Sequence, residues 1–399
     1  MTLNVFDFYS RCLLPLTPHD SVTRILELVT IGGETTDDFA KVVAHDSEVQ
    51  HWIRLTVSRL GFDKRISKID QMITILGQNR IRDLIIGRHI ERAFIPADKT
   101  ILGEALAKAQ QDKEKAAPKT TPAKPKFSDT PEADAPPAAE QPEEQEAVPS
   151  LSEFRRYLTH ANRAEEVAIA IRNSYPGQAF VGGVIFDYLR YFLGTLDLSK
   201  LQDPRLTKTE EFIESIFIDG LRSGIAANEI MQKISIPHQK IVFMAAMLHN
   251  IGRGLLLAYD PESFEKVYLM STGSKDPRLK VESFEAEEAI FDFDHAQAGA
   301  LFLGRLSFLR EIERSVDYHH NADILRFANP GLYAMACVLR ISGALSKLYQ
   351  KSRVKDANID RIPDAKLATS REFEFLKLTP EDWHGIKANY ALKLMKVQL

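Results

Sequence analysis

The sequence predicts an all-α fold, and three observations support this class. Apolar residues recur three and four positions apart through most of the chain, which is the period of a helix with one buried face. Sustained alternation of apolar and polar residues, which is typical of strands, is missing between residues 13 and 92. Of the 399 residues, 44% are hydrophobic, enough for a sizeable core in one large domain or two ordinary ones.

Residues 1–95 are predicted to form an N-terminal subdomain of short helices. Thr35 is followed within three positions by two acids and then by an apolar run from Phe39, which is the pattern of an N-cap with acids in the first turn. Gly77 follows an apolar segment and is expected to end it. Besides the helix after Thr35, we expect helices over residues 22–29, 51–60, 69–76 and 81–90.

Residues 97–149 have the composition of a disordered linker. Ala, Pro, Lys, Glu and Gln dominate, and too few large apolar side chains are present to offset the entropy lost on folding. Lysines gather between Lys108 and Lys126, whereas only acids carry charge from Asp129 to Glu146. We interpret the segment as a solvated linker. A docking tether with a basic and an acidic half is the functional alternative.

Helical periodicity returns after the linker. Residues 151–205 are interpreted as an inserted helical segment, and residues 206–399 as a second helical subdomain that ends in a C-terminal helix. The start of that last helix is marked by Thr379 as the cap, Pro380 at the first helical position and Asp382 as the capping-box acid.

The stretch from Phe243 to Leu257 is an apolar run broken by His249 and Asn250. One continuous helix is predicted here, with Pro237 suited to its first turn and Tyr259 near its end. A helix that is apolar on all sides must be buried. The two polar side chains therefore need partners, a metal or a ligand, because each group left unpaired costs roughly 1–3 kcal/mol.

Three motifs in the C-terminal half resemble signatures of the HD-type metal-dependent phosphohydrolases. They are Leu248-His-Asn-Ile-Gly252, Phe293-Asp-His-Ala-Gln-Ala-Gly299 and Tyr318-His-His320. N-terminal pieces, including Leu14-Pro-Leu16 and Leu76-Gly-Gln-Asn-Arg-Ile-Arg82, make the whole order similar to HDOD, the HD-related output domain. The resemblance implies a helical bundle of two subdomains and a signalling module that is usually non-catalytic.

The resemblance also implies where the metal ligands of an HD-type hydrolase would lie. His249 matches the histidine of the His-Asp doublet, whereas Asn250 stands in place of its aspartate. Asp219 lies where an earlier histidine is expected, and Gly343 stands where a distal aspartate is expected. The other motif histidines that remain are His295, His319 and His320.

This ligand set is poor for a pair of metal ions. Two hard cations that activate a water need charged carboxylates between them, but Asn250 offers one uncharged oxygen and Gly343 offers none. We therefore predict a vestigial pocket without metal, cofactor or catalytic residues, in which the histidines hydrogen-bond to one another and to helix backbone. One alternative is a pocket that binds a nucleotide without turning it over. Another is a single metal held by His249, His295, His319 and, as a further ligand, Asp219.

Composition excludes several classes of protein. The net charge is −4, and no segment is basic enough to suggest binding to nucleic acid or to a membrane surface. Cys12 and Cys337 are the only cysteines, which argues against a disulfide framework. The N-terminus has no signal-peptide pattern, and no apolar run approaches the roughly 20 residues of a membrane span. Phosphate-loop, dinucleotide and nucleophile-elbow motifs do not occur. We expect a cytoplasmic protein.

The expected function is that of a non-enzymatic bacterial signalling adaptor that acts through protein–protein contacts. The expected partner is a response regulator, a cyclic-dinucleotide enzyme or a motility regulator, with residues 97–205 as the likeliest partner-facing part. A metal-dependent phosphohydrolase with atypical ligands and a nucleotide sensor are the alternatives. The remaining histidines, among them His19, His45 and His89, are expected to be structural or on the surface.

Overall fold

The computed structural model describes most of the chain outside the predicted linker. The described residues are 5–13, 16–32, 34–59, 62, 66, 68–101, 103–104, 107–108, 111, 151–235, 239–272, 281–306, 308–352 and 370–399. Throughout these ranges the secondary structure is helical and no residue lies in a strand, as predicted. Residues 112–149 of the predicted linker and Pro237 lie outside the described residues.

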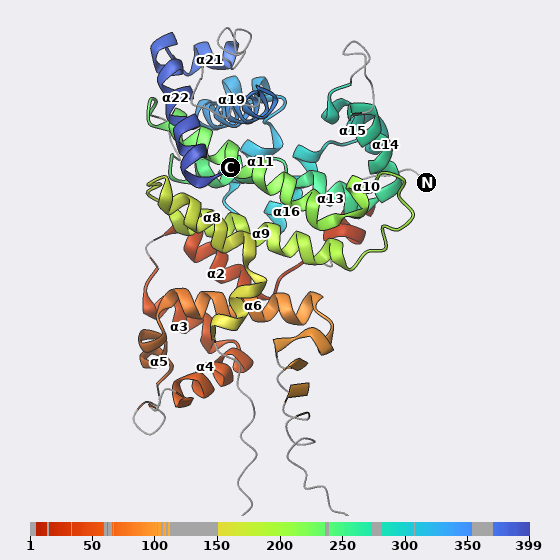
Figure 1. The fold of residues 1–399 in the computed structure, drawn as a ribbon. Coiled ribbons are helices and arrows are strands. Elements are labelled where there is room, and N and C mark those ends of the chain that lie inside the picture. The colour runs from red at the N-terminus through yellow and green to blue at the C-terminus, as the bar shows by residue number, and fades with distance from the viewer. Residues whose placement is uncertain are drawn as a thin grey trace, which may run out of the picture.

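The helices between residues 20 and 94 gather toward one end of the molecule, whereas the first helix lies against the C-terminal half, where Phe8 packs on Tyr259 and Phe293 (Figure 1). The predicted cap is confirmed, because Thr35 and Asp38 form a complete capping box at the start of α3. Gly77 ends α5 with a φ of +83°, a conformation that glycine adopts without steric cost. The helices are α1 (Val5–Phe8), α2 (Asp20–Ile31), α3 (Thr36–Ala44), α4 (Ser47–Arg59), α5 (Ile69–Leu76) and α6 (Gln78–Phe94), with a π-helical turn at Tyr9–Leu13 and a 3-10 turn at Ala97–Lys99.

The helices that follow the linker occupy the middle of the molecule (Figure 1). They are a 3-10 segment (Leu151–Tyr157), α8 (Thr159–Ala170), α9 (Pro176–Gly194) and α10 (Pro204–Thr207). Nearly every residue of α9 is buried, and the helix packs against α2, α6, α11, α12 and α13. The expectation that residues 151–205 face a partner is therefore wrong for α9, which is a core helix that joins both halves of the molecule.

A buried ion-pair group holds the N-terminal helices to this middle layer. The guanidinium of Arg82 on α6 lies 3.0 Å from the carboxylate of Asp83 and 3.3 Å from that of Glu165 on α8. The same guanidinium lies 3.3 Å from the ring centroid of Phe180 on α9. Because the Arg82 side chain is almost fully buried, loss of both acids would leave a charge without its counter-ion in the core.

The C-terminal helices form the second bundle, in which α11 and α19 pack against α12. The second predicted capping box is confirmed at Thr379 and Asp382. These helices are α11 (Thr209–Met231), α12 (Val242–Leu248), α13 (Gly252–Tyr259), α14 (Pro261–Thr272), α15 (Ser283–Phe291), α16 (His295–Arg305), α17 (Arg310–Asp317), α18 (Leu325–Ala328), α19 (Pro330–Ser352), α21 (Arg371–Phe375) and α22 (Pro380–Val397), with 3-10 turns at Gln239–Ile241 and Ala322–Ile324.

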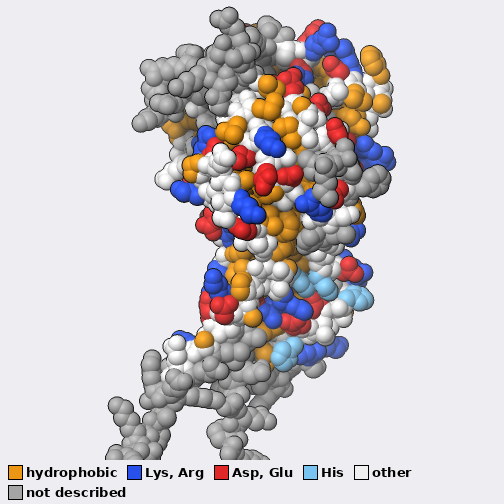
Figure 2. Space-filling model, turned by 90° about the vertical axis from the view of Figure 1, so that its right-hand side faces the viewer, with side chains coloured by type: hydrophobic (Ala, Val, Ile, Leu, Met, Phe, Trp, Pro, Cys, Tyr) orange, Lys and Arg blue, Asp and Glu red, His pale blue; other side chains and the backbone are white. Residues whose placement is uncertain are grey.

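Two helical segments are apolar enough by length and composition to cross a membrane. They are Val242–Tyr259 and Pro330–Gln350, of which 89% and 67% are buried inside the protein. The expectation that no segment reaches this apolarity was wrong, but burial of this extent is typical of core helices in a soluble protein. On the face shown in Figure 2, acidic and basic side chains are interspersed, without a large area of one charge.

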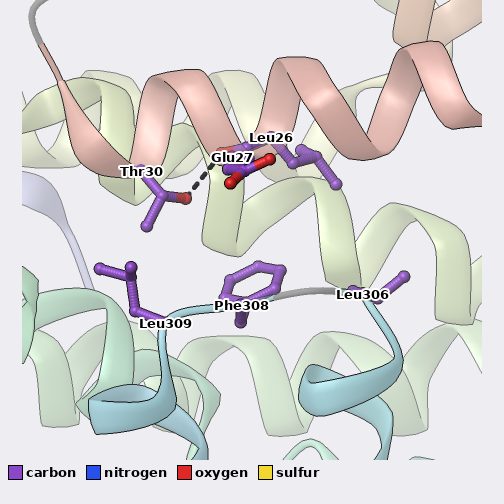
Figure 3. A pocket seen from close by; sticks show the side chains of 6 residues that line it. All are labelled: Leu26, Glu27, Thr30, Leu306, Phe308 and Leu309. Carbon is purple, nitrogen blue, oxygen red and sulfur yellow. Dashed lines mark hydrogen bonds between the residues drawn. The ribbon is translucent and has the colours of Figure 1, made fainter.

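A small hollow lies where the two halves meet. It is lined by Leu26, Glu27 and Thr30 from α2, and by Leu306, Phe308 and Leu309 from the chain between α16 and α17 (Figure 3). The hydroxyl of Thr30 donates to the carbonyl of Leu26 at 2.7 Å, so this polar group is satisfied within its own helix. With space for about one water molecule, at 10 Å³, the hollow is a packing feature rather than a ligand pocket.

Candidate functional site

The predicted continuous helix is divided at the histidine that interrupts its apolar run. α12 ends at Leu248, His249–Ile251 form a turn, and α13 begins at Gly252. The Nδ1–H of His249 donates to the carbonyl oxygen of Ala246 at 2.7 Å, so the side chain competes for a backbone acceptor of the last helical turn. The amide of Ile251 then donates to Leu248 at 2.9 Å, the three-residue spacing of a tight turn.

Gly252 allows α13 to lie directly against α16. A Cβ placed on this residue would lie 1.9 Å from the carbonyl oxygen of His295 and 2.8 Å from the amide nitrogen of Gly299. Only a residue without a side chain fits at this distance from another backbone. Gly252 therefore allows the close approach of α13 and α16, which brings His295 to the pocket beside His249.

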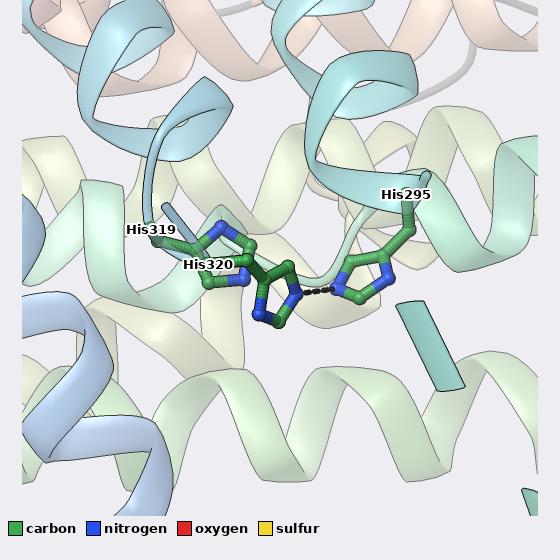
Figure 4. A group of neighbouring side chains, drawn as sticks. All are labelled: His295, His319 and His320. Carbon is green, nitrogen blue, oxygen red and sulfur yellow. Dashed lines mark hydrogen bonds between the residues drawn. The ribbon is translucent and has the colours of Figure 1, made fainter. Parts of the chain in front are cut away.

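Three imidazoles meet in this pocket: His295 at the start of α16, and His319 and His320 just after α17 (Figure 4). Nε2 of His295 and Nε2 of His320 are 3.0 Å apart. One ligand atom from each of the three residues lies within 4.8 Å of the others. His319 donates from Nδ1 to the carbonyl of Val316 at 2.7 Å, and its Nε2 has no hydrogen-bond partner among the described residues. The geometry leaves this lone pair free to bind a ligand.

Glu287 on α15 supports His295 from behind, and the sequence did not indicate it. One carboxylate oxygen accepts from Nδ1–H of His295 at 2.5 Å and from its backbone N–H at 2.8 Å. The other oxygen, Oε1, has no partner among the described residues. Burial raises the pKa of Glu287 to about 7, despite the opposing charge of Arg253. A carboxylate behind a histidine fixes the ring so that Nε2 faces the pocket, as is usual behind metal-bound histidines.

All three histidines, and His249 with them, are held neutral. Burial lowers the pKa of His295 and His319 well below the usual value, and the positive charge of Arg253 acts in the same direction on His295. Burial also lowers the pKa of His249 and His320. Neutral imidazoles are the form that binds metal ions. The pocket is therefore chemically able to accept a cation without first releasing protons from its histidines.

Gly343 on α19 lies beside His249, as the motif pattern implied. A Cβ on Gly343 would lie 3.1 Å from Nε2 of His249. The ring of His249 also meets the ring of His319 edge to face, with their centroids 5.1 Å apart. A carboxylate at position 343 would therefore reach the histidines, but this chain presents only backbone there.

The two remaining predicted residues pair with each other. The side-chain amide of Asn250 donates to Oδ2 of Asp219 on α11 at 3.0 Å. Oδ1 of Asp219 accepts the hydroxyl of Ser346 on α19 at 2.7 Å. Both oxygens of Asp219 thus already accept hydrogen bonds from neutral groups. The structure brings together all seven residues that the motif pattern selected, and it adds Glu287 and Ser346.

The histidine pocket lies in a part of the chain that matches a family model. The model of the HDOD domain family matches residues 195–322, which include His249, Asn250, His295, His319 and His320. Residues 195–322 are therefore an HDOD domain, as the motifs predicted. No curated protein matches the sequence.

Similar solved structures include proteins from three bacteria. An HDOD domain protein of unknown function from Geobacter sulfurreducens is 14% identical, with a TM-score of 0.39, over 96% of this chain and 88% of that one. A candidate phosphohydrolase from Shewanella amazonensis is 12% identical, with a TM-score of 0.36, over 97% and 98% of the two chains. The MmoQ response regulator from Methylococcus capsulatus is 16% identical, with a TM-score of 0.35, over 59% and 88%.

Proposed function

We propose that this protein is a non-catalytic signalling adaptor of the cytoplasm, which acts through contacts with another signalling protein. The proposal rests on one observation. The position that faces Nε2 of His249 is Gly343, and a Cβ on this glycine would lie 3.1 Å from that nitrogen. Membership of the HDOD family supports a role in signalling. Among the described residues of this pocket, positions 250 and 343 hold no carboxylate that could bind a second metal ion.

The hydrogen bonds around Asn250 support the same conclusion. In a bimetallic hydrolase a carboxylate bridges two cations, and the cations lower the pKa of a bound water and stabilise charge on the phosphoryl group. Here the amide of Asn250 is directed at Asp219, 3.0 Å away, so it uses the nearest carboxylate as a hydrogen-bond acceptor. The pocket thus replaces a metal–carboxylate contact with a neutral amide–carboxylate pair.

Metal analysis tests the absence of catalysis. We expect protein purified without chelator to hold fewer than two equivalents of iron or manganese and to show no hydrolysis of phosphodiester substrates. The double variant Asn250→Asp, Gly343→Asp should hold more metal than the wild type, because it supplies both missing carboxylates. Asn250→Asp, Gly343→Asn is the matched control, with the same added volume and no second charge. Two equivalents in the wild type, together with hydrolysis, would refute the proposal.

A phosphohydrolase with a single metal is the second candidate function. The observation that favours it is the convergence of His295, His319 and His320 within 4.8 Å, with Glu287 behind His295. This candidate is supported if the wild type binds one equivalent of metal and hydrolyses a phosphate ester, and if His320→Ala loses both properties. Binding of a cyclic dinucleotide in a thermal-shift assay, without turnover, would instead support a nucleotide sensor.

A partner capture experiment tests the adaptor role. Ile101 is buried and its amide donates to Glu91, so a deletion that leaves the fold intact must begin beyond it. We place its start after residue 111, the last residue that the structure describes before residue 151. We expect a candidate response regulator, cyclic-dinucleotide enzyme or motility regulator to bind the wild type, and to bind a chain without residues 112–149 more weakly. Replacement of the segment by Gly/Ser of equal length is the control for spacing. If none of these partner classes binds either form, the adaptor role loses its support.

A further inference from the structure

A second group of metal-ligating side chains lies in the N-terminal subdomain, away from the histidine pocket. It contains His19, which precedes α2, Asp46, which precedes α4, and His89 on α6. One nitrogen of each imidazole and one carboxylate oxygen all lie within 4.8 Å of one another. The sequence pattern gave no reason to connect these residues, because they are far apart in the chain and the two histidines were expected to be structural or on the surface.

We propose that His19, Asp46 and His89 bind one divalent transition-metal ion of the zinc type. Nε2 of His89 and Oδ2 of Asp46 are 3.2 Å apart. Ligands around a tetrahedral zinc ion, with bonds of about 2.0–2.1 Å, are separated by about 3.3 Å. The two buried ligands already have the spacing that the ion requires, so binding needs little rearrangement.

Ser21 joins the three side chains at the centre of the cluster. Its hydroxyl oxygen lies 2.8 Å from Nδ1 of His19, 3.2 Å from Oδ2 of Asp46 and 3.1 Å from Nε2 of His89. Nδ1 of His19 and Oδ2 of Asp46 are acceptors, because Nδ1 of His19 already accepts the backbone N–H of Ser21. The Ser21 hydroxyl hydrogen and the Nε2–H of His89 can each serve one of these acceptors. A divalent cation at the centre would take the place of the Nε2 proton of His89, which would move to Nδ1.

The scaffold around the cluster keeps the ligands in place. Oδ1 of Asp46 accepts the backbone N–H of Val49 at 3.0 Å, which leaves Oδ2 directed at the cluster. The guanidinium of Arg88 lies 2.7 Å from Glu48, an ion pair that ties α6 to α4 beside the two buried ligands. A ligand position fixed by hydrogen bonds and ion pairs loses little entropy when a metal binds.

The site is open on the side of His19. Asp46 and His89 are buried, whereas His19 is exposed and its ring stacks on that of His89, with centroids 4.6 Å apart. Histidine side chains are visible at the surface of this half of the molecule in Figure 2. Two imidazoles and one carboxylate leave at least one position for water or for an outside ligand, as in zinc sites that are not purely structural.

Cobalt titration tests this site in the full-length protein. The background is His320→Ala, which removes one imidazole from the histidine pocket. In this background we expect one equivalent of Co²⁺ to bind with visible absorption typical of a four- or five-coordinate ion. Adding His19→Ser should raise the apparent Kd by at least about tenfold. Serine keeps the N-cap acceptor of α2, so this variant should remain folded.

His51→Ala in the same background is the matched control, because His51 is exposed on α4 and is not part of the cluster. This variant should bind Co²⁺ as tightly as the background does, and Zn²⁺ should displace Co²⁺ from both. The proposal is overturned if the background binds no Co²⁺, or if His19→Ser leaves the affinity unchanged. Neither result depends on whether the histidine pocket is catalytic.

Discussion

Gly252→Ala is expected to destabilise the protein by about 3 kcal/mol or more, because the new methyl group would make the shortest backbone contact of any glycine that the structure describes. The new Cβ would lie 1.9 Å from the carbonyl oxygen of His295 and 2.8 Å from the amide nitrogen of Gly299. Both neighbours are backbone atoms of α16, which cannot swing aside as a side-chain end can. To accept the methyl group, α13 and α16 must move apart, and the contact of His295 with His320 must open.

Urea unfolding followed by circular dichroism measures this effect, and two glycines provide controls. Gly254→Ala, on the same helix, should cost less, because its Cβ would meet the end of the Leu189 side chain at 2.4 Å, and that side chain can rotate. Gly194→Ala should cost nothing, because no atom lies within 4 Å of its would-be Cβ. Equal stability of Gly252→Ala and Gly194→Ala would show that the two helices are not in backbone contact.

The features of the fold that depend only on residues close together in the chain could be predicted from the sequence. The apolar period and the terminating glycine gave α5 its observed bounds, Ile69–Leu76. The N-cap at Thr35 and the capping box of Thr379 with Asp382 lie where they were predicted. Each of these signals acts within one helical turn, so no knowledge of the tertiary structure is needed to interpret it.

The division of the central helix was not predictable from its apolar pattern. Whether His249 interrupts the helix depends on the direction of its ring, and the ring is fixed by a hydrogen bond to Ala246 at 2.7 Å. Glu287 was missed for a related reason. It lies among several acids, Glu282, Glu285 and Glu288, and nothing in the local pattern says which of them is buried against His295.

The residues that the family pattern selected lie together in the structure, because such a pattern carries information about long-range contacts. Asp219, Asn250 and Gly343 come from three different helical regions, and periodicity alone would not connect them. The His19, Asp46 and His89 cluster has no such pattern, so only the folded structure reveals it. Residues 97–205 were expected to face a partner, but α9, which lies within them, is buried. The sequence alone did not show that this helix belongs to the core.

Asp187→Ala is expected to have an effect of similar size, a loss of about 3–5 kcal/mol. Asp187 is fully buried on α9, yet it acts as the cap of another helix, α8, whose own N-cap residue Leu158 makes no side-chain bond. Its carboxylate accepts the backbone N–H groups of His160 and Ala161, each at 3.0 Å. It also accepts Nδ1–H of His160 at 2.8 Å. Alanine leaves all three donors buried and unpaired, and removes the negative charge that the helix N-terminus favours.

The loss should depend on pH in a defined direction. Burial alone lowers the pKa of His160, but hydrogen bonds to Asp187 and Glu214 outweigh it and raise the pKa above its usual value. A raised pKa in the folded state adds stability that is complete below the unfolded pKa of about 6.5 and is lost as the pH rises through the folded value. The difference in stability between wild type and Asp187→Ala should therefore be larger in mild acid than at alkaline pH.

Urea unfolding at several pH values measures the loss of stability and its pH dependence, and two variants separate these two effects. Asp187→Asn keeps an acceptor oxygen for the helix N-terminus but loses the charge, so it should recover part of the stability and little of the pH dependence. Glu166→Ala, at an exposed position of α8, should leave the stability unchanged. A loss in Asp187→Ala that does not vary with pH would mean that the carboxylate acts on α8 only through the backbone, and that His160 is neutral throughout.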